Sequence, residues 1–129
     1  MTYPTKEEIL ATPVEYSSQD IEWVKNWKVD HWRKARKLED IRARIYALSI
    51  LIQELAKFRN MKITVFYKPE LKTACFVPKE NAIYLTNSSI ISALHECAHA
   101  LFGDSELTAC AWSVNLFIRF FPKAYAKLH

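Results

Sequence analysis

The sequence predicts an α+β protein that is mostly helical, with a small sheet packed on one of its helices. Apolar residues recur at intervals of three and four along much of the chain, which is the period of an amphipathic helix. Only residues 62–86 change to short runs rich in β-branched and aromatic residues. The chain has one glycine and five prolines in 129 residues, so tight turns are few, as in a helical protein.

Length and composition predict one domain that covers residues 1–129. A chain of 129 residues with 50% hydrophobic residues can build one core but not two. We expect a helical N-terminal part over residues 1–60, a small three-stranded and mainly antiparallel sheet within residues 62–86, and further helices over residues 87–129.

The N-terminal part is expected to hold three helices. Thr5 is a suitable N-cap for a short helix that extends to Leu10, before Pro13. From Ser18 to Leu55 the helical pattern is nearly continuous. One helix of that length is far above the usual length in a small domain, so we predict two helices with a break near Asp30.

Three strands are predicted in the middle of the chain. The runs are Ile63–Tyr67, Ala74–Val77 and Ala82–Thr86, and Pro69 and residues 78–81 mark the turns between them. We expect Ala82–Thr86 to be an edge strand with which an extended peptide could pair.

The strongest motif is His95-Glu96-Cys97-Ala98-His99, an HExxH sequence inside a predicted helix. Asn87 and Ser88 are suitable N-caps for this helix, and Gly103 suits the position after its end. At about 100° per residue, His99 lies about 40° round the helix from His95, so both imidazoles can reach one Zn²⁺.

The remaining residues of the motif have different expected roles. Glu96 lies about 100° from His95, which suits it to hold a water beside the metal and to act as general base. Cys97 lies about 200° away and is expected in the core. The spacing therefore predicts a zinc-dependent peptidase.

A catalytic zinc normally has three protein ligands and a water, so a third ligand is needed. After Gly103 a second helix can begin near Asp104 or Ser105 and fold back towards the histidines. Glu106, in its first turn, is our choice as third ligand, and Asp104 stays the alternative. Cys110 is expected to lie in the core.

The residues from Ile83 to Pro122 resemble the ImmA/IrrE group of small HExxH metallopeptidases. The resemblance rests on the extended Ile83–Thr86, on Ala93–Leu101 with the two histidines, and on Glu106–Trp112, and it extends more loosely back to residue 38. The chain differs from the group at Ala98, where a glycine is usual, and in a short gap between the second histidine and Glu106.

This resemblance implies a substrate class. Members of the group are linked to the cleavage of one chosen protein, commonly a helix-turn-helix repressor, and no such motif is evident in this chain. The expected function is therefore zinc-dependent cleavage of a specific protein partner. The alternative is a non-catalytic regulatory module with a zinc site that binds nucleic acid or a protein through its basic helix.

A basic section lies between Lys25 and Arg44. The net charge is +4, the pI is about 9.0, and tryptophans are interleaved with the cations of this section. Lysine and arginine beside aromatic residues can bind nucleic acid. A solvated helix face, or one that docks an acidic partner protein, explains the same pattern, and nucleic acid is the less favoured partner.

A cytoplasmic location is expected. The start of the chain does not resemble a signal peptide, and no apolar run is long enough to cross a membrane. The three cysteines are odd in number and spread along the chain, which favours free thiols in a reducing compartment. The oligomeric state does not follow from the sequence.

Overall fold

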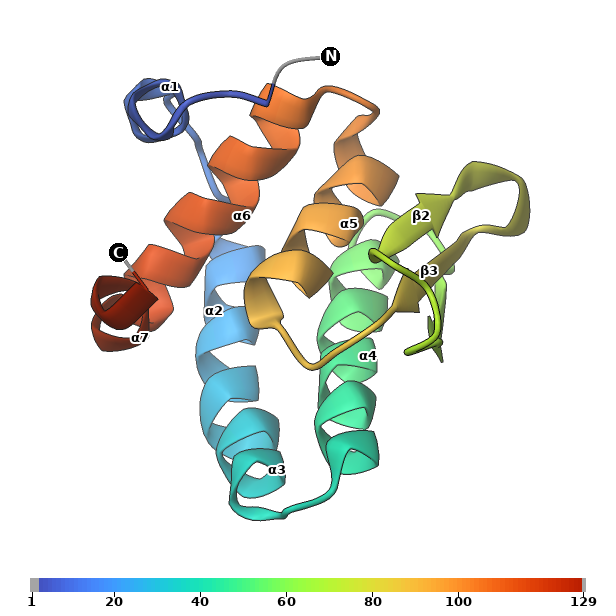
Figure 1. The fold of residues 1–129 in the computed structure, drawn as a ribbon. Coiled ribbons are helices and arrows are strands. Elements are labelled where there is room, and N and C mark those ends of the chain that lie inside the picture. Colours follow the sequence, from blue (N-terminus) through green and yellow to red (C-terminus); the bar gives the residue numbers. More distant parts are fainter. Residues whose placement is uncertain (1–2, 129) are drawn as a thin grey trace.

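The computed structural model describes residues 3–128, so the predicted domain limits at residues 1 and 129 lie outside the described part. The predicted class is confirmed: the protein is α+β, mostly helical, with one three-stranded sheet (Figure 1). The helices are α1 (Lys6–Ala11), α2 (Ser18–Trp27), the π-helical turn η1 (Lys28–Trp32), α3 (Arg33–Lys37), α4 (Ile41–Lys57), the 3₁₀ turn η2 (Pro78–Glu80), α5 (Ile90–Phe102), α6 (Glu106–Phe120) and α7 (Pro122–Leu128). The strands are β1 (Thr64–Tyr67), β2 (Cys75–Val77) and β3 (Ala82–Leu85).

The helical segment that α2, η1 and α3 form is continuous and folds back on α4 (Figure 1). The predicted break near Asp30 is therefore wrong, because Asp30 lies inside η1. The chain leaves the helix at Leu38, whose φ of −87° and ψ of 138° are extended. Asp40 then caps α4, where its side chain accepts a hydrogen bond of 3.0 Å from the backbone N–H of Arg42.

The packing of two buried tryptophans explains the π-helical turn. Trp27 and Trp32 are stacked with ring centroids 5.5 Å apart, and only 0% and 9% of their surfaces are exposed. Residues five apart lie about 140° apart round an α-helix, and the wider π turn reduces that angle to about 50°. The turn therefore lets both indoles face the core, where Trp27 Nε1 donates a 2.7 Å hydrogen bond to the Ala47 carbonyl.

The sheet has the order β1–β3–β2 and is mixed rather than mainly antiparallel. β3 pairs in parallel with β1 and antiparallel with β2. The prediction that Ala82–Thr86 forms an edge strand is wrong, because β3 is central and the edges are β1 and β2. Ala82, Ile83 and Leu85 are at most 1% exposed, and a strand so deeply buried takes the centre of a sheet.

Helix α5 lies at the middle of the molecule, in contact with α4, α6, β2 and β3 (Figure 1). Its inner face carries Leu94, Cys97 and Ala98, each at most 1% exposed, in one core with Leu48 and Leu51 of α4. Its opposite side carries the histidines. Within residues 3–128, no helix combines the length and the apolar character that crossing a membrane requires.

An ion pair connects α2 to the turn that follows α4. Asp20 is 1% exposed, and Arg59 contacts both of its carboxylate oxygens, Nη1 at 3.1 Å from Oδ1 and Nη2 at 2.5 Å from Oδ2. Arg59 also donates to the Leu55 carbonyl. The pair satisfies a carboxylate that the core would otherwise leave without a partner.

Candidate metal centre

The two histidines of the motif lie one turn apart on α5. The helix begins after Ser89, whose hydroxyl accepts from the Ser92 backbone N–H, so the N-cap is Ser89 rather than the expected Asn87 or Ser88. The Nε2 atoms of His95 and His99 lie 3.2 Å apart. Both rings thus direct their Nε2 atoms towards one point.

The turn after α5 brings a carboxylate to these nitrogens. Gly103 has φ +110°, a conformation that L residues rarely adopt, and Ser105 caps α6. Glu106, the first residue of α6, places Oε1 2.8 Å from His99 Nε2 and Oε2 3.2 Å from His95 Nε2. The expected fold-back from Gly103 is therefore present.

The hydrogen-bond geometry of this cluster is compatible with a bound cation at its centre. His99 Nδ1 lies 2.9 Å from the Gly103 carbonyl, which can only accept, so this nitrogen carries the hydrogen. In a neutral ring Nε2 then has a lone pair, and it faces a carboxylate oxygen of Glu106. Among residues 3–128, no hydrogen bond reaches the buried Glu106 Oε2. A cation between the three side chains would satisfy all of these atoms.

The three side chains fit a zinc ion. Two nitrogens that each lie about 2.05 Å from a tetrahedral zinc are about 3.3 Å apart, close to the 3.2 Å between the histidine Nε2 atoms. One ligand atom from each of His95, His99 and Glu106 lies within 4.8 Å of the others. Asp104 is exposed and does not belong to this group, whereas Glu106 does. The Nδ1 contact of His99 with Gly103 is the kind of second hydrogen bond that orients a ligating imidazole.

Glu96 lies beside the cluster and borders the sheet. Burial is the largest cause that raises the pKa of its carboxyl to about 7, with a smaller contribution from Glu106 in the same direction. His99 and the backbone of Phe76 oppose this shift. Because Phe76 belongs to β2, this edge strand lies next to Glu96.

The two cysteines near the motif are buried, as expected for core residues. Cys97 is 0% exposed, and burial raises the pKa of its thiol to about 12. Cys110 is 7% exposed, but its sulfur lies 3.8 Å from His95 Nδ1, so it contacts the back of a candidate ligand. Cys110 thus supports the His95 ring from behind, a role that the helical pattern alone does not reveal.

One residue beside the site was not foreseen from the sequence. The negative charge of Glu106 is the largest cause that raises the pKa of the Tyr3 phenol, and the charges of Cys110 and Glu96 raise this pKa further. The N-terminal segment accordingly runs past the first turn of α6 (Figure 1). Tyr3 lies far from the motif in the sequence, and no local pattern points to it.

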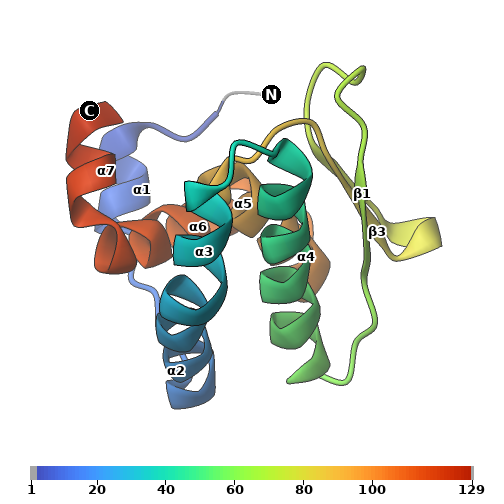
Figure 2. The same ribbon diagram turned by 90° about the horizontal axis from the view of Figure 1, so that it is seen from below.

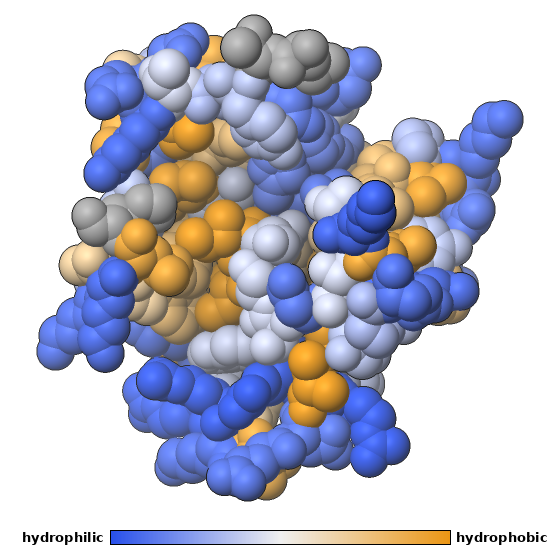
Figure 3. Space-filling model, in the orientation of Figure 1, coloured by the Kyte–Doolittle hydropathy of each residue, from blue (hydrophilic) through white to orange (hydrophobic). Residues whose placement is uncertain are grey.

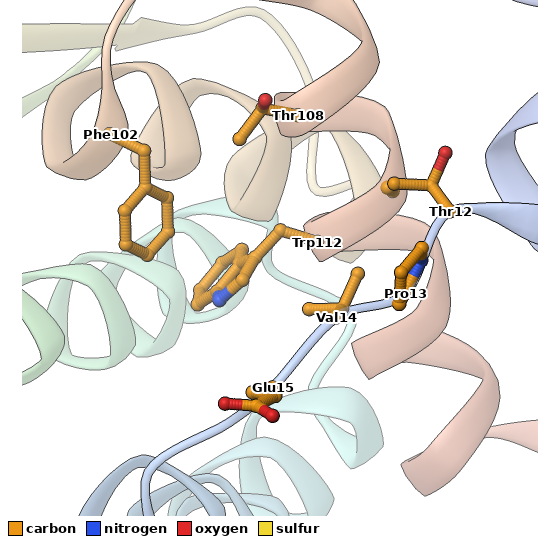
Figure 4. A pocket seen from close by; sticks show the side chains of 8 residues that line it. Thr12, Pro13, Val14, Glu15, Phe102, Thr108 and Trp112 are labelled. Carbon is orange, nitrogen blue, oxygen red and sulfur yellow. The ribbon is translucent and has the colours of Figure 1, made fainter.

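A small hollow of about 210 Å³ lies beside the start of α6. It is separate from the group of His95, His99 and Glu106, which we call the metal cluster. Figure 4 shows Val14 of the α1–α2 linker beside Trp112, with Phe102 and Thr108 on the other side. The Tyr16 hydroxyl donates 2.6 Å to the Trp112 carbonyl and holds the linker there. This hollow contains none of the three candidate ligands.

Comparisons with known proteins give no relative. No protein-family model, no curated protein and no solved structure is significantly similar to this chain. A functional assignment therefore depends on the geometry of the cluster and on the residues around it.

Proposed function

We propose that the protein is a zinc-dependent endopeptidase that cleaves a specific protein partner in the cytoplasm. His95, His99 and Glu106 hold the metal, and Glu96 is the general base. The single observation that carries this proposal is the convergence of two histidine Nε2 atoms and one carboxylate on a point that adjoins Glu96. The resemblance to ImmA/IrrE metallopeptidases supports the same assignment.

Each residue has a chemical task in this reaction. A bound zinc supplies activation of water and polarisation of the substrate carbonyl. Glu96 accepts the proton from the attacking water and later returns it to the leaving amine. The proton transfer gives Glu96 a use that a purely structural zinc site would not have.

The edge strand β2 is the element that we assign to substrate alignment. Its outer side is not paired within the sheet. The backbone of Phe76, in this strand, lowers the pKa of the Glu96 carboxyl through a hydrogen bond. An extended peptide that pairs with β2 would pass close to the general base. This assignment replaces the one made for the central strand β3.

The proposal is tested with purified protein, zinc and candidate helix-turn-helix repressors. The wild type should cut the partner at one or a few sites, and Glu96→Gln or a chelator should stop the cleavage. Glu22→Gln is the matched control, since Glu22 is exposed on α2 and the change is chemically the same. Equal cleavage by the Glu96→Gln protein would refute the mechanism.

The second candidate is a regulatory module that keeps zinc and binds nucleic acid or protein through its basic helix. The cluster of cations around α3 is the observation that favours it. Under this alternative, Glu96→Gln would leave every measured property unchanged.

A further inference from the structure

A second and larger hollow of about 750 Å³ lies away from the metal cluster. It lies between η1 and α3 on one side and the end of α6 with α7 on the other, elements that Figure 2 shows side by side. This volume is in the range of sites that bind small molecules or anchor side chains of a partner. We call it the basic hollow.

The charge of the basic hollow has one sign. Its lining has no acidic residue and has the cations Lys28, Arg33, Arg36, Lys123 and Lys127. Within residues 3–128, none of these five forms a salt bridge. In Figure 3 hydrophilic residues predominate at the lower end of the molecule, where α3 lies, with a few hydrophobic ones among them. Lys28 Nζ donates a hydrogen bond to the Phe120 carbonyl, and a cluster of cations without acidic neighbours in its lining attracts an anionic partner.

The floor of the basic hollow is apolar, and two of its aromatic rings, those of Trp32 and Phe121, already have a neighbour on at least one face. One face of Trp32 stacks on Trp27. Phe121 is stacked on Phe117 at 5.2 Å, and Lys28 Nζ lies 4.8 Å from the centroid of the Phe121 ring. Nucleic acid bases bind by stacking on free aromatic faces, so this floor suits an apolar side chain better than a base.

We propose that the basic hollow binds an acidic peptide segment that carries an apolar anchor residue. The carboxylates of the segment pair with the cations of the two walls, and the anchor contacts the edges of Trp32, Phe120 and Phe121. The inference rests on the proposed function in one respect, which is that the bound segment is taken to be part of the substrate. The π-helical turn contributes by holding Trp32 in the floor while Lys28 and Arg33 stay at the wall.

Helix α6 sets the distance between docking and cleavage. Its first residue is Glu106 of the metal cluster, and its last, Phe120, lines the basic hollow. The 15 residues of α6 separate these ends by about 21 Å. An extended chain needs at least about six residues to cover this distance. The acidic segment of a substrate is therefore expected at least that far from the bond that is cut.

The test uses the full chain and a short synthetic peptide that alternates glutamate with leucine and phenylalanine. Binding is measured by fluorescence anisotropy, with the glutamine version of the peptide as the uncharged control. One protein variant combines Arg36→Gln with Lys123→Gln, one cation from each wall. The matched control combines Lys34→Gln with Lys37→Gln, which are exposed on α3 but do not line the basic hollow.

The first pair should weaken binding of the acidic peptide by about tenfold or more, and the control pair by less than about twofold. A smaller difference between the two pairs, or no binding of the acidic peptide, would overturn the proposal. So would a single-stranded oligonucleotide that binds more tightly than the peptide and depends on Arg36 and Lys123. Zinc content of the same variants is measured in parallel, so a failure of docking is distinguished from a failure of the metal site.

Discussion

His99 shows how single residues shape the candidate metal centre. Its Nδ1–H donates to the Gly103 carbonyl at 2.9 Å, and this contact leaves Nε2 free to face Glu106. A hydrogen bond on one ring nitrogen fixes both the tautomer and the ring orientation. The site is thus set up by a backbone carbonyl that belongs to the turn between α5 and α6.

At the same scale, Glu96 is predicted to act on protons and not on the metal. Glu96→Gln should keep the zinc content and the thermal unfolding midpoint of the wild type, because the amide has the same size as the carboxyl. It should abolish cleavage, since an amide does not accept the proton at neutral pH. Zinc analysis, thermal unfolding and a cleavage assay on the same preparation check this. Loss of zinc in Glu96→Gln would make Glu96 a ligand instead.

The third ligand is tested by a pair of alanine variants. Glu106→Ala should lower zinc affinity by 10-fold or more, on the order of 1.4 kcal/mol, because it removes one of three ligand side chains. Asp104→Ala should leave the affinity unchanged, because Asp104 is exposed and outside the cluster. Titration with a competing chelator measures both. The opposite result would transfer the role of third ligand to Asp104.

At the scale of elements, the turn between α5 and α6 decides whether the cluster forms. Gly103 has φ +110° and nothing lies within 4 Å of where a Cβ would be, so a side chain meets backbone strain but no clash. Gly103→Ala should therefore destabilise the protein by about 1–3 kcal/mol and weaken zinc binding. Chemical denaturation with and without zinc measures both effects. Asp104→Ala is the control, since Asp104 is not among the residues with positive φ. Wild-type stability in Gly103→Ala would contradict this role of the turn.

The ion pair between α2 and the turn after α4 gives a second prediction about elements. Arg59→Ala leaves the buried carboxylate of Asp20 without its partner, and the free energy of unfolding should fall by about 3 kcal/mol. Arg42→Ala breaks an exposed pair with Asp40 and should cost less than about 1 kcal/mol. Urea unfolding compares the two. Equal losses would mean that burial does not set the contribution of the Arg59 pair.

The parts of the fold that the sequence predicts correctly are those with local causes. The 3.6-residue period, the Thr5 cap and Gly103 act within a few residues, so α1, α5 and the start of α6 follow from the sequence. The spacing of His95 and His99 likewise follows from helix geometry alone. Strand order, the π turn and the position of Tyr3 depend on distant contacts. The Trp27–Trp32 stack, for example, forms against α4.

At the scale of the whole molecule, the metal cluster and the basic hollow use different elements. The cluster is built from α5 and the first turn of α6, and the basic hollow from η1, α3, the end of α6 and α7. A small domain has little surface around a metal site from which to form pockets for substrate side chains. Selection of a partner is therefore expected to depend on surfaces away from the metal.

This arrangement predicts a selective enzyme. Casein, a generic unfolded substrate, should be cut slowly by the isolated protein, and a specific partner that co-purifies with Glu96→Gln should be cut at one or a few sites. Mass spectrometry of the products at equal enzyme concentration makes the comparison. Rapid and indiscriminate degradation of casein would show a general peptidase and would contradict the docking role of the basic hollow.

The most direct test of the metal centre is elemental analysis of protein prepared without chelators. The wild type and Glu96→Gln should each contain about one zinc per chain, and His95→Ala and His99→Ala should contain none, because each removes one of the two imidazole ligands. His31→Ala is the control, since His31 does not belong to the cluster. No metal in the wild type, or unchanged zinc in His99→Ala, would contradict the assignment of this site and of the peptidase function built on it.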